Sequence, residues 1–327
     1  MMKPVCVIIP CYNSMDTIIR LLRSLQIQTS KCFDTYLAID GDSHLEDYKG
    51  LKDHFDIHVM YFKENMGAGM TRQRCLDKIK SKYQYVMFAD SDDMLNPRAL
   101  EILYKAIITT RSDIAYSSII RQLEDNSSYM IDVNNKEHKA ISWCVGKLYN
   151  IDFLKKKRIR FRKELRLNED IYFNYMCFNL TDKVVRVSEV TYLWLYNKNS
   201  TTTKDKSLDY IIYNIEQSLL SSTYSILDLA KKNKNRLDEK ILATKLINIY
   251  SISQEALHYN INMNQFKYIY DMLSNEVDVY EFVKNNVEFY VDRLQQISIS
   301  NNFKYYYFKQ SFIEFIKEAY NNKKGGN

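Results

Sequence analysis

The sequence has no apolar run long enough to cross a membrane as a helix. At its start the chain reaches the strand-like run "VCVII" too soon for the apolar region of a secretory signal. Its 6 cysteines are scattered, and no two of them have the close spacing of metal ligands. This pattern favours reduced core thiols over a disulfide framework or a cysteine-bound metal. We therefore expect a cytoplasmic protein.

The excess of positive over negative charge is also small. The formal net charge of +6 over 327 residues is too small to indicate a partner by itself. The chain is 46% hydrophobic and 26% charged, which is the composition of an ordinary soluble protein. Its length allows one large domain or two ordinary ones.

Strand-like and helical patterns alternate in the first third of the chain. The strand-like runs are 5–10, 34–40, 57–62 and 83–90, and the helical patterns are 16–28, 69–81 and 97–110. This alternation predicts an α/β fold built from βαβ units around a largely parallel sheet. From residue 206 the apolar residues recur at helical spacing, so we expect a domain of residues 1–205 and an all-helical C-terminal domain of residues 206–327.

Groups suited to a nucleotide lie at or just after the end of each of the first four predicted strands. They are Pro10, Tyr12 and Asn13 for the first strand, Asp40 and Asp42 for the second, Gly67, Gly69 and Arg72 for the third, and Asp90, Ser91 and Asp92 for the fourth. Ligands of open α/β sheets gather at the carboxyl ends of the strands. An aromatic ring, amides, a guanidinium and carboxylates at that edge suit stacking, base hydrogen bonds, a phosphate and a metal ion.

Two of the 7 glycines, Gly67 and Gly69, lie just before the helix that carries Arg72. Close approach of the backbone to a ligand is one reason to place glycine there. A tight turn is the other, and the sequence leaves both open.

Three aspartates occupy the four positions from Asp90 to Asp93. Carboxylates this close repel one another and need a compensating charge. In an extended segment Asp90 and Asp92 project to the same side, where they suit Mg²⁺ or Mn²⁺ shared with substrate phosphates. The alternative is that Asp92 and Asp93 only terminate the strand.

Together these motifs resemble a known family. The runs "VIIPCYNSMDTI", "AIDGDS", "NMGAGMTRQR" and "YVMFADSDDML" resemble the nucleotide-binding half of a family 2 glycosyltransferase with a Rossmann-like GT-A fold. The likeness continues through "GKLYNIDFLKKKRIRF" and "LNEDIYFNYM", over roughly residues 4–202. It implies a donor half of about residues 1–110, an acceptor half of about residues 111–205, and inverting, metal-dependent transfer from a UDP-sugar.

The resemblance also implies roles for single residues. Asp40 or Asp42 would hold the base of the nucleotide-sugar, with Tyr12 against it. Pro10, Asn13 and Ser91 would also lie in the donor site. Arg72 would approach the nucleotide, Asp90 the ribose, and Asp92 the Mn²⁺ or Mg²⁺ on the diphosphate. Glu169 would line the acceptor pocket, and Asp170 would be the catalytic base.

Two positions depart from the family pattern. The family usually has two adjacent aspartates where this chain has Asp40-Gly41-Asp42, so which carboxylate meets the base stays open. Where many members carry Arg or His in a loop that contacts the diphosphate, this chain has "LYNKNSTTT", in which Lys198 could supply the charge.

Asp170 also has an interpretation that does not need the family. It opens a helical pattern, and a positioned carboxylate there could accept the proton of an acceptor hydroxyl. Alternatively, Glu169 and Asp170 are first-turn acids that the helix dipole favours.

The acceptor side carries the densest basic segment of the chain, residues 155–166. Arginines alternate there with Ile159 and Phe161, which predicts a strand with one apolar and one cationic face. Such a face could attract an anionic acceptor, either a phosphate-containing surface polymer or a lipid-linked precursor. The alternative is a solvated turn and edge strand. Trp143 and Lys147 precede the segment and suit a sugar pocket, although Trp143 could equally be a core residue.

The helical end of the chain allows two kinds of contact. Residues 303–324 combine Phe and Tyr with lysines, as in a helix lying on the inner face of a membrane. Packing on the catalytic domain or on a second copy of the chain, as a homo-oligomer, is the alternative.

Three further functions compete with transfer to a surface polymer. They are a nucleic-acid-modifying glycosyltransferase, a catalytically inert binding scaffold, and a phosphatase of the haloacid-dehalogenase type in which Asp90 is the nucleophile.

Overall fold

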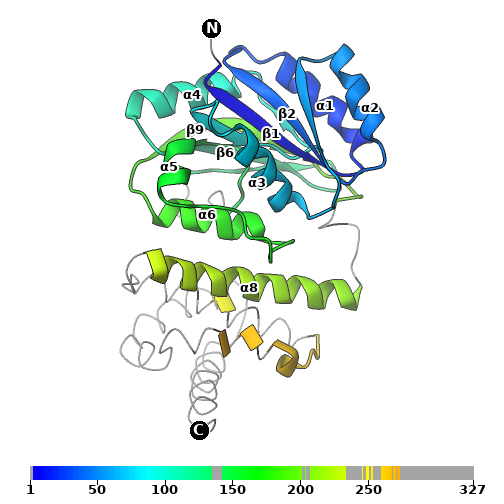
Figure 1. Ribbon diagram of the computed structural model, residues 1–327, viewed down its shortest axis with the longest axis vertical. Coiled ribbons are helices and arrows are strands. Elements are labelled where there is room, and N and C mark those ends of the chain that lie inside the picture. Colours follow the sequence, from blue (N-terminus) through cyan, green and yellow to red (C-terminus); the bar gives the residue numbers. More distant parts are fainter. Residues whose placement is uncertain are drawn as a thin grey trace. The chain divides into compact units, whose positions relative to one another are not determined.

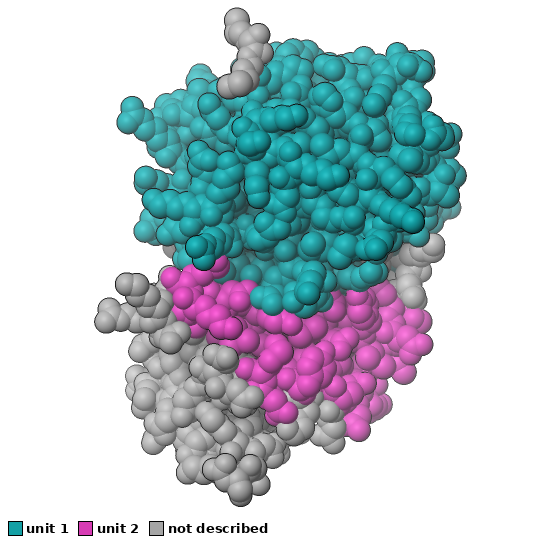
Figure 2. Space-filling view, viewed as in Figure 1, with its two compact units in different colours: residues 1–205 teal, residues 206–327 magenta. Residues whose placement is uncertain are grey.

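The computed structural model divides into two compact units, residues 1–205 and 206–327, which Figure 2 draws in separate colours. The described residues are 3–134, 142–200, 203, 207–232, 245, 248–249, 252, 259–266, 268–269 and 271–272. Within these ranges, no helix has the length and apolar character of a membrane span.

One mixed sheet forms the centre of the first unit. Its strands are β1 (Val5–Cys11), β2 (Phe33–Asp40), β3 (Ile57–Phe62), β4 (Tyr85–Phe88), β5 (Met94–Leu95), β6 (Ile114–Gln122), β7 (Ser128–Ile131), β8 (Lys147–Asn150) and β9 (Val184–Trp194). The strand order is β3-β2-β1-β4-β8-β6-β9-β5, and β7 pairs with β6.

The direction of strand pairing changes along the sheet. The pairs β3-β2, β2-β1 and β1-β4 are parallel, and so is β6-β9. The pairs β4-β8, β8-β6, β6-β7 and β9-β5 are antiparallel. The predicted α/β fold is confirmed, but its parallel part is mainly the first four strands. Beyond them β6 and β7 form a hairpin, and antiparallel neighbours need no helical crossover.

Helices pack on the sheet (Figure 1). They are α1 (Met15–Gln26), α2 (Leu45–Gly50), α3 (Ala68–Ile79), α4 (Ala99–Thr110), α5 (Ile151–Lys156) and α6 (Glu169–Asn179), with one 3₁₀ turn, η1 (Leu51–Asp53). Helix α3 packs against β1 and β2, and α4 packs against β6 and β9. In α1 the residues Ile18, Leu21, Leu22 and Leu25 are buried, which is the spacing of one helix face.

An aromatic cluster lies beneath the loops that carry the acidic motifs. The rings of Phe161 and Phe173 stack with centroids 4.1 Å apart, and Phe88 meets both of them edge to face. Phe88 ends β4, Phe173 lies on α6, and Phe161 lies between α5 and α6. Aromatic burial therefore fixes the end of β4 against the start of α6.

The strand predicted within residues 155–166 is wrong. Residues 157–168 form a loop between α5 and α6, in which Ile159 and Phe161 are buried. The alternation of apolar and basic residues is real, but the chain turns at Arg158, where φ is +52°, and residues 157–168 pair with none of the strands that the structure describes. Part of the positive charge is used locally, since Arg160 pairs with Asp77.

The second unit is helical where the structure describes it. Helix α8 (Leu208–Lys232) has buried apolar residues at helical spacing, and a short 3₁₀ turn, η3, spans Met263–Phe266. This confirms the prediction that the C-terminal part of the chain begins with a helix. The contacts predicted for residues 303–324, with a membrane or with a second copy, lie outside the described residues.

Candidate functional site

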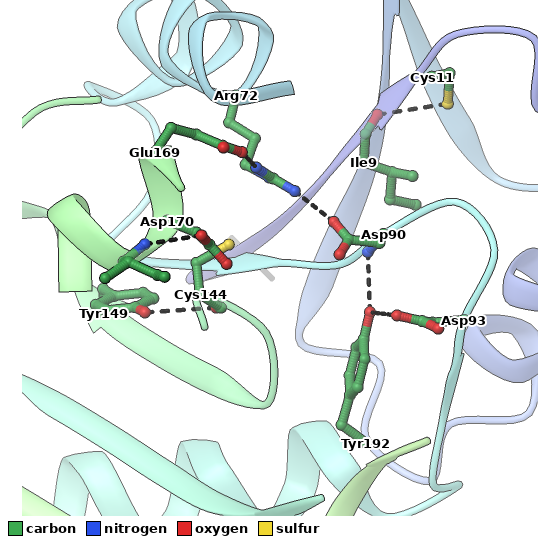
Figure 3. A network of polar contacts seen from close by, with 11 residues as sticks. Ile9, Cys11, Arg72, Asp90, Asp93, Cys144, Tyr149, Glu169, Asp170 and Tyr192 are labelled. Atoms are coloured by element: carbon green, nitrogen blue, oxygen red, sulfur yellow. Dashed lines mark hydrogen bonds and ion pairs between the residues drawn. The ribbon is translucent and has the colours of Figure 1, made fainter. Parts of the chain in front are cut away.

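The acidic turn after β4 is held by a tyrosine of β9. The Asp90 backbone N–H donates to the Tyr192 hydroxyl over 2.9 Å, and this hydroxyl donates to Asp93 Oδ2 over 2.7 Å (Figure 3). The other oxygen of Asp93 accepts from the Leu195 N–H at 2.9 Å. Burial, then the charges of Asp90 and Asp92, raise the pKa of Asp93. Asp93 thus fixes the turn that carries Asp90 and Asp92.

Removing the Tyr192 hydroxyl should destabilise the protein. The substitution Tyr192→Phe leaves the Asp90 N–H without its acceptor and takes one donor from the buried Asp93 carboxylate. Such unsatisfied buried groups cost about 1–3 kcal/mol. Denaturant unfolding should show this loss, whereas Tyr61→Phe, at an exposed tyrosine of β3, should be neutral. Equal stability of the two variants would contradict the structural role of Tyr192.

Asp92 lies on the same turn and has a partner that the sequence did not indicate. Its Oδ2 accepts from the Asn197 side-chain amide at 2.8 Å. Burial and the neighbouring Asp90 charge raise the pKa of Asp92. The sequence pointed to Lys198 in this loop, but Lys198 is exposed, and the residue before it, Asn197, makes the contact with Asp92.

The surroundings of Asp92 suit a divalent cation shared with a substrate. A cation would offset the repulsion between Asp90 and Asp92 that raises the pKa of Asp92. Within the described ranges, no cluster of three or more His, Cys, Asp or Glu side chains is arranged to bind a metal. Mg²⁺ and similar ions are often held by one or two carboxylates, with substrate phosphates completing the shell. The residues present fit such a shared ion.

Glu169 and Asp170 form the first turn of α6. Glu169 is 8% exposed and Asp170 is half-buried. Burial, and then the charge of Glu169, raise the pKa of Asp170 to about 7. One Asp170 oxygen accepts from the Ile171 N–H at 2.8 Å (Figure 3). A carboxylate with a pKa near neutrality is suited to accept a proton from a substrate hydroxyl.

Arg72 connects this helix to the acidic turn. Its Nη1 donates to Glu169 Oε1 over 3.0 Å, and its Nη2 donates to Asp90 Oδ1. The sequence placed Arg72 against a nucleotide. In the structure its two terminal nitrogens pair with carboxylates (Figure 3), and the contact with the nucleotide stays a prediction.

The aspartates at and just after the end of β2 are buried, and their carboxylates accept hydrogen bonds from other residues of the protein. Asp40 accepts from the backbone N–H groups of Met66 and Gly67, at 3.0 and 2.8 Å. Asp42 accepts from the Asn13 and His44 N–H groups and from the Tyr48 hydroxyl. Each carboxylate therefore organises a neighbouring loop, and which of them meets a base stays open.

The first strand end contributes an exposed ring. Tyr12 is 54% exposed, whereas Pro10 is half-buried in β1. Asn13 has a φ of +49° and is fixed through its backbone by Asp42. Ser91 is half-buried within the acidic turn. The Tyr12 ring is thus available for stacking at the edge of the sheet where β2 ends and the loop with Asp42 follows.

Gly67, just before α3, and Gly69, in its first turn, serve two structural needs. Gly67 has a φ of +84°, which other residues adopt at a cost. A Cβ at Gly69 would lie 2.4 Å from Glu169 Cγ. The turn is therefore one reason for glycine here, and the close approach is to the Glu169 side chain within the protein.

Trp143 and Lys147 lie on the segment before α5, residues 142–150, which includes β8. Lys147 is 1% exposed, and its ammonium donates to the backbone carbonyls of Trp143 and Val145. Burial lowers the pKa of Lys147 to about 8. Lys147 thus shapes the loop rather than presenting its charge at the surface. Trp143 is half-buried and meets Trp194 edge to face, with centroids 5.0 Å apart.

Asn174 attaches this segment to α6, a contact that the sequence did not reveal. Its side-chain amide donates to the Asp170 carbonyl at 2.9 Å and to the Ser142 carbonyl at 3.3 Å. No local pattern marks Asn174, Tyr192 or Asn197. The Ser142 partner of Asn174 and the partners of Tyr192 and Asn197 lie far away in the sequence, so only the fold brings them together.

Comparisons with known proteins agree with this architecture. The family model described as glycosyl transferase family 2 matches residues 6–185. Glycosyltransferase GlyA of Streptococcus pneumoniae is 28% identical over 221 residues, which are 60% of this chain and 31% of GlyA. The poly(ribitol-phosphate) beta-N-acetylglucosaminyltransferase TarP of Staphylococcus aureus is 30% identical over 194 residues, 53% of this chain and 56% of TarP. The matches thus span about a third to just over half of these relatives.

A solved structure matches over nearly the whole chain. Residues 1–349 of S. aureus TarS, in complex with UDP-GlcNAc, superpose with a TM-score of 0.68 at 17% identity. The match covers 98% of this chain and 92% of that structure. This likeness in fold confirms the expected GT-A architecture.

Proposed function

Because the chain belongs to glycosyl transferase family 2, we propose that it transfers a sugar from a UDP-sugar to a hydroxyl group of a teichoic-acid-like surface polymer. The observation that carries this proposal is the half-buried Asp170 carboxylate. Its pKa is raised to about 7 by burial and by Glu169, and Arg72 links Glu169 to Asp90 in the acidic turn. A proton acceptor and a diphosphate site so arranged suit glycosyl transfer.

The names of the relatives support the kind of sugar and the kind of acceptor that we propose. TarP is a poly(ribitol-phosphate) beta-N-acetylglucosaminyltransferase. A poly(ribitol-phosphate) beta-glucosyltransferase of Bacillus spizizenii is 24% identical over 210 residues. The sugar is accordingly a hexose or an N-acetylhexosamine. The acceptor is a polyol-phosphate chain, or a related lipid-linked precursor.

On the donor side, loops at the carboxyl ends of β1, β2 and β4 receive the nucleotide. The exposed Tyr12 ring stacks against the base, beside the loops that Asp40 and Asp42 hold in place. Asp90 meets the ribose. Asp92, with Asn197 beside it, would hold Mn²⁺ or Mg²⁺. When bound, the ion would supply positive charge for the departing UDP.

On the acceptor side, Asp170 accepts the proton of the attacking hydroxyl. The hydroxyl oxygen forms a bond to the anomeric carbon as the bond from that carbon to the diphosphate breaks, so a single displacement inverts the anomeric centre. Trp143 lies on the segment that Asn174 ties to the first turn of α6, and it offers an aromatic edge near the acceptor. Glu169 positions the base through its ion pair with Arg72.

Nucleotide binding can be tested on the intact protein by thermal shift. UDP and UDP-sugars should raise the melting temperature when Mn²⁺ is present, since a ligand at about 100 times its Kd stabilises the native state by about 2.7 kcal/mol. ADP and GDP serve as controls and should have little effect. Equal shifts with all three diphosphates, or none with UDP, would contradict the donor assignment.

The acceptor requires a transfer assay with the donor that emerges from this screen. Poly(ribitol-phosphate) should accept the sugar, and a neutral polysaccharide and a DNA duplex should not. Transfer to DNA would support the nucleic-acid-modifying alternative. Binding of UDP-sugar with neither transfer nor donor hydrolysis would identify an inert scaffold.

A further inference from the structure

The Arg72 side chain joins the acceptor half of the site to the donor half from inside the protein. It extends from α3 with its side chain 4% exposed. One terminal nitrogen meets Glu169 on α6, and the other meets Asp90 after β4 (Figure 3). Burying a guanidinium between two carboxylates is favourable only where the geometry is well matched.

The surroundings hold this ion triad in place. The Arg72 guanidinium lies 5.8 Å from the centroid of the Phe161 ring. Gly69, three residues before Arg72, leaves room for the Glu169 side chain, because a Cβ at Gly69 would lie 2.4 Å from Glu169 Cγ. Glu169 is therefore held by an ion pair at its carboxylate and by the α3 backbone along its stem.

The triad also sets the electrostatic environment of Asp170. Burial raises the pKa of Asp170 most, the Glu169 and Asp90 charges raise it further, and the Arg72 charge lowers it. On the segment before α5, the titratable groups that interact with Asp170 are Cys144, Lys147 and Tyr149.

We propose that Arg72 is a positioning residue of the transfer reaction, which holds Glu169 beside the base Asp170 and ties this carboxylate pair to Asp90 on the donor side. The proposal rests on the function proposed above, and it gives Arg72 a role other than direct contact with the nucleotide. Tyr192 holds the Asp90 backbone and Arg72 holds the Asp90 carboxylate, so one guanidinium connects the donor-side carboxylate to the pair beside the base.

Removal of each charge moves the pKa of Asp170 in a known direction. Arg72→Gln removes the positive neighbour, which raises the pKa of Asp170, so the transfer rate should reach its plateau at higher pH. Glu169→Gln removes a negative neighbour, which lowers that pKa, so the plateau should begin at lower pH. A nearby charge typically accounts for about one pH unit or more. Loss of packing alone does not produce shifts of opposite sign.

The experiment compares the pH dependence of transfer in wild type, Arg72→Gln, Glu169→Gln and a matched control, Arg74→Gln. Arg74 lies on the same helix, but its guanidinium lies over the Phe62 ring at 4.4 Å and donates to the Glu64 carbonyl. The control should keep the wild-type midpoint. Midpoints that stay in place in both test variants, or that move in the same direction, would overturn the proposal.

A direct nucleotide contact predicts a different result. If Arg72 binds the donor itself, Arg72→Gln should weaken UDP binding by tenfold or more in calorimetry and leave the pH midpoint unchanged, and this outcome also overturns the proposal. Should Arg72→Gln fail to fold, Glu169→Gln decides alone. It keeps a carbonyl oxygen for Arg72 Nη1, and an unchanged midpoint in this variant refutes the positioning role.

One measurement separates this inference from the proposed function. The carbon-13 signal of the Asp170 carboxyl group, identified by its disappearance in Asp170→Asn, titrates without any turnover. Opposite shifts of its pKa in the two variants support the positioning role even if no transfer is seen. Absence of transfer with every donor and acceptor tested refutes the proposed function, whereas unshifted carboxyl titrations refute the role of Arg72.

Discussion

Replacement of Asp170 by asparagine should lower the rate of sugar transfer by about two to four orders of magnitude, the span that general base catalysis supplies. The substitution removes the proton acceptor and keeps nearly the same shape, including an oxygen that can accept from the Ile171 N–H. The loss should appear in kcat rather than in the KM for the donor, since the missing interaction belongs to the transition state. UDP and metal affinity, measured by calorimetry, should be almost unchanged.

The stability of the Asp170→Asn variant separates catalysis from a helix-capping role. The pKa of Asp170 is raised on folding, by burial first and Glu169 second. The ionised carboxylate therefore disfavours the native state as the pH rises from about 4 toward 7. The variant should accordingly be as stable as wild type, or more stable, at pH 8.

A first-turn helix acid should behave in the opposite way. Its removal should cost up to about 1 kcal/mol and leave turnover intact. Asp152 is the matched control, because it lies in the first turn of α5 with its side chain 90% exposed. Asp152→Asn should lower the melting temperature slightly and keep the transfer rate. If Asp170→Asn behaves like Asp152→Asn, Asp170 is not the base.

Replacement of Asp92 by asparagine should abolish turnover, with a loss of about 10³-fold or more. A metal ion on the leaving diphosphate supplies several kcal/mol of charge stabilisation, and each 1.36 kcal/mol is about a tenfold change in rate. Asp92 is the carboxylate that we assign to this ion. The variant should also lose the Mn²⁺-dependent part of UDP affinity, measured by calorimetry with and without the ion.

The fold should survive this substitution. Burial and Asp90 raise the pKa of Asp92, so a neutral side chain removes a repulsion. Its amide oxygen can still accept from Asn197. Asp125→Asn, at an exposed position in the hairpin between β6 and β7, is the control and should keep full activity. Undiminished transfer by the wild-type protein in excess chelator would refute the metal assignment.

The sequence by itself was sufficient to predict the fold and the edge at which the candidate site lies. Alternating strand and helix patterns are local, and the four parallel strands β3-β2-β1-β4 follow from them. Because parallel strands end at the same edge, motifs after β1, β2 and β4 were expected to lie close together. The acidic run after β4 and the acids that open α6 were visible for the same reason, since each follows a clear local pattern.

Local sequence patterns do not predict the half of the sheet that contains the antiparallel pairs. The antiparallel pairs made by β8 join segments separated by tens of residues, and no local periodicity specifies them. The basic segment illustrates the difference. Its alternation correctly placed Ile159 and Phe161 inside, but a strand also requires backbone pairing with a neighbour, and the described part of the chain shows no such pairing for this segment.

Only the tertiary structure decided what each polar group of the site contacts. Arg72 and Glu169 are 97 positions apart in the sequence, and Asp92 and Asn197 are 105 apart. Side-chain type shows which bonds a residue can make, and the fold selects which of them it does make. The sequence shows, for example, that Arg72 can pair with anionic groups, and its packing between α3, α6 and the end of β4 brings it to Glu169 and Asp90.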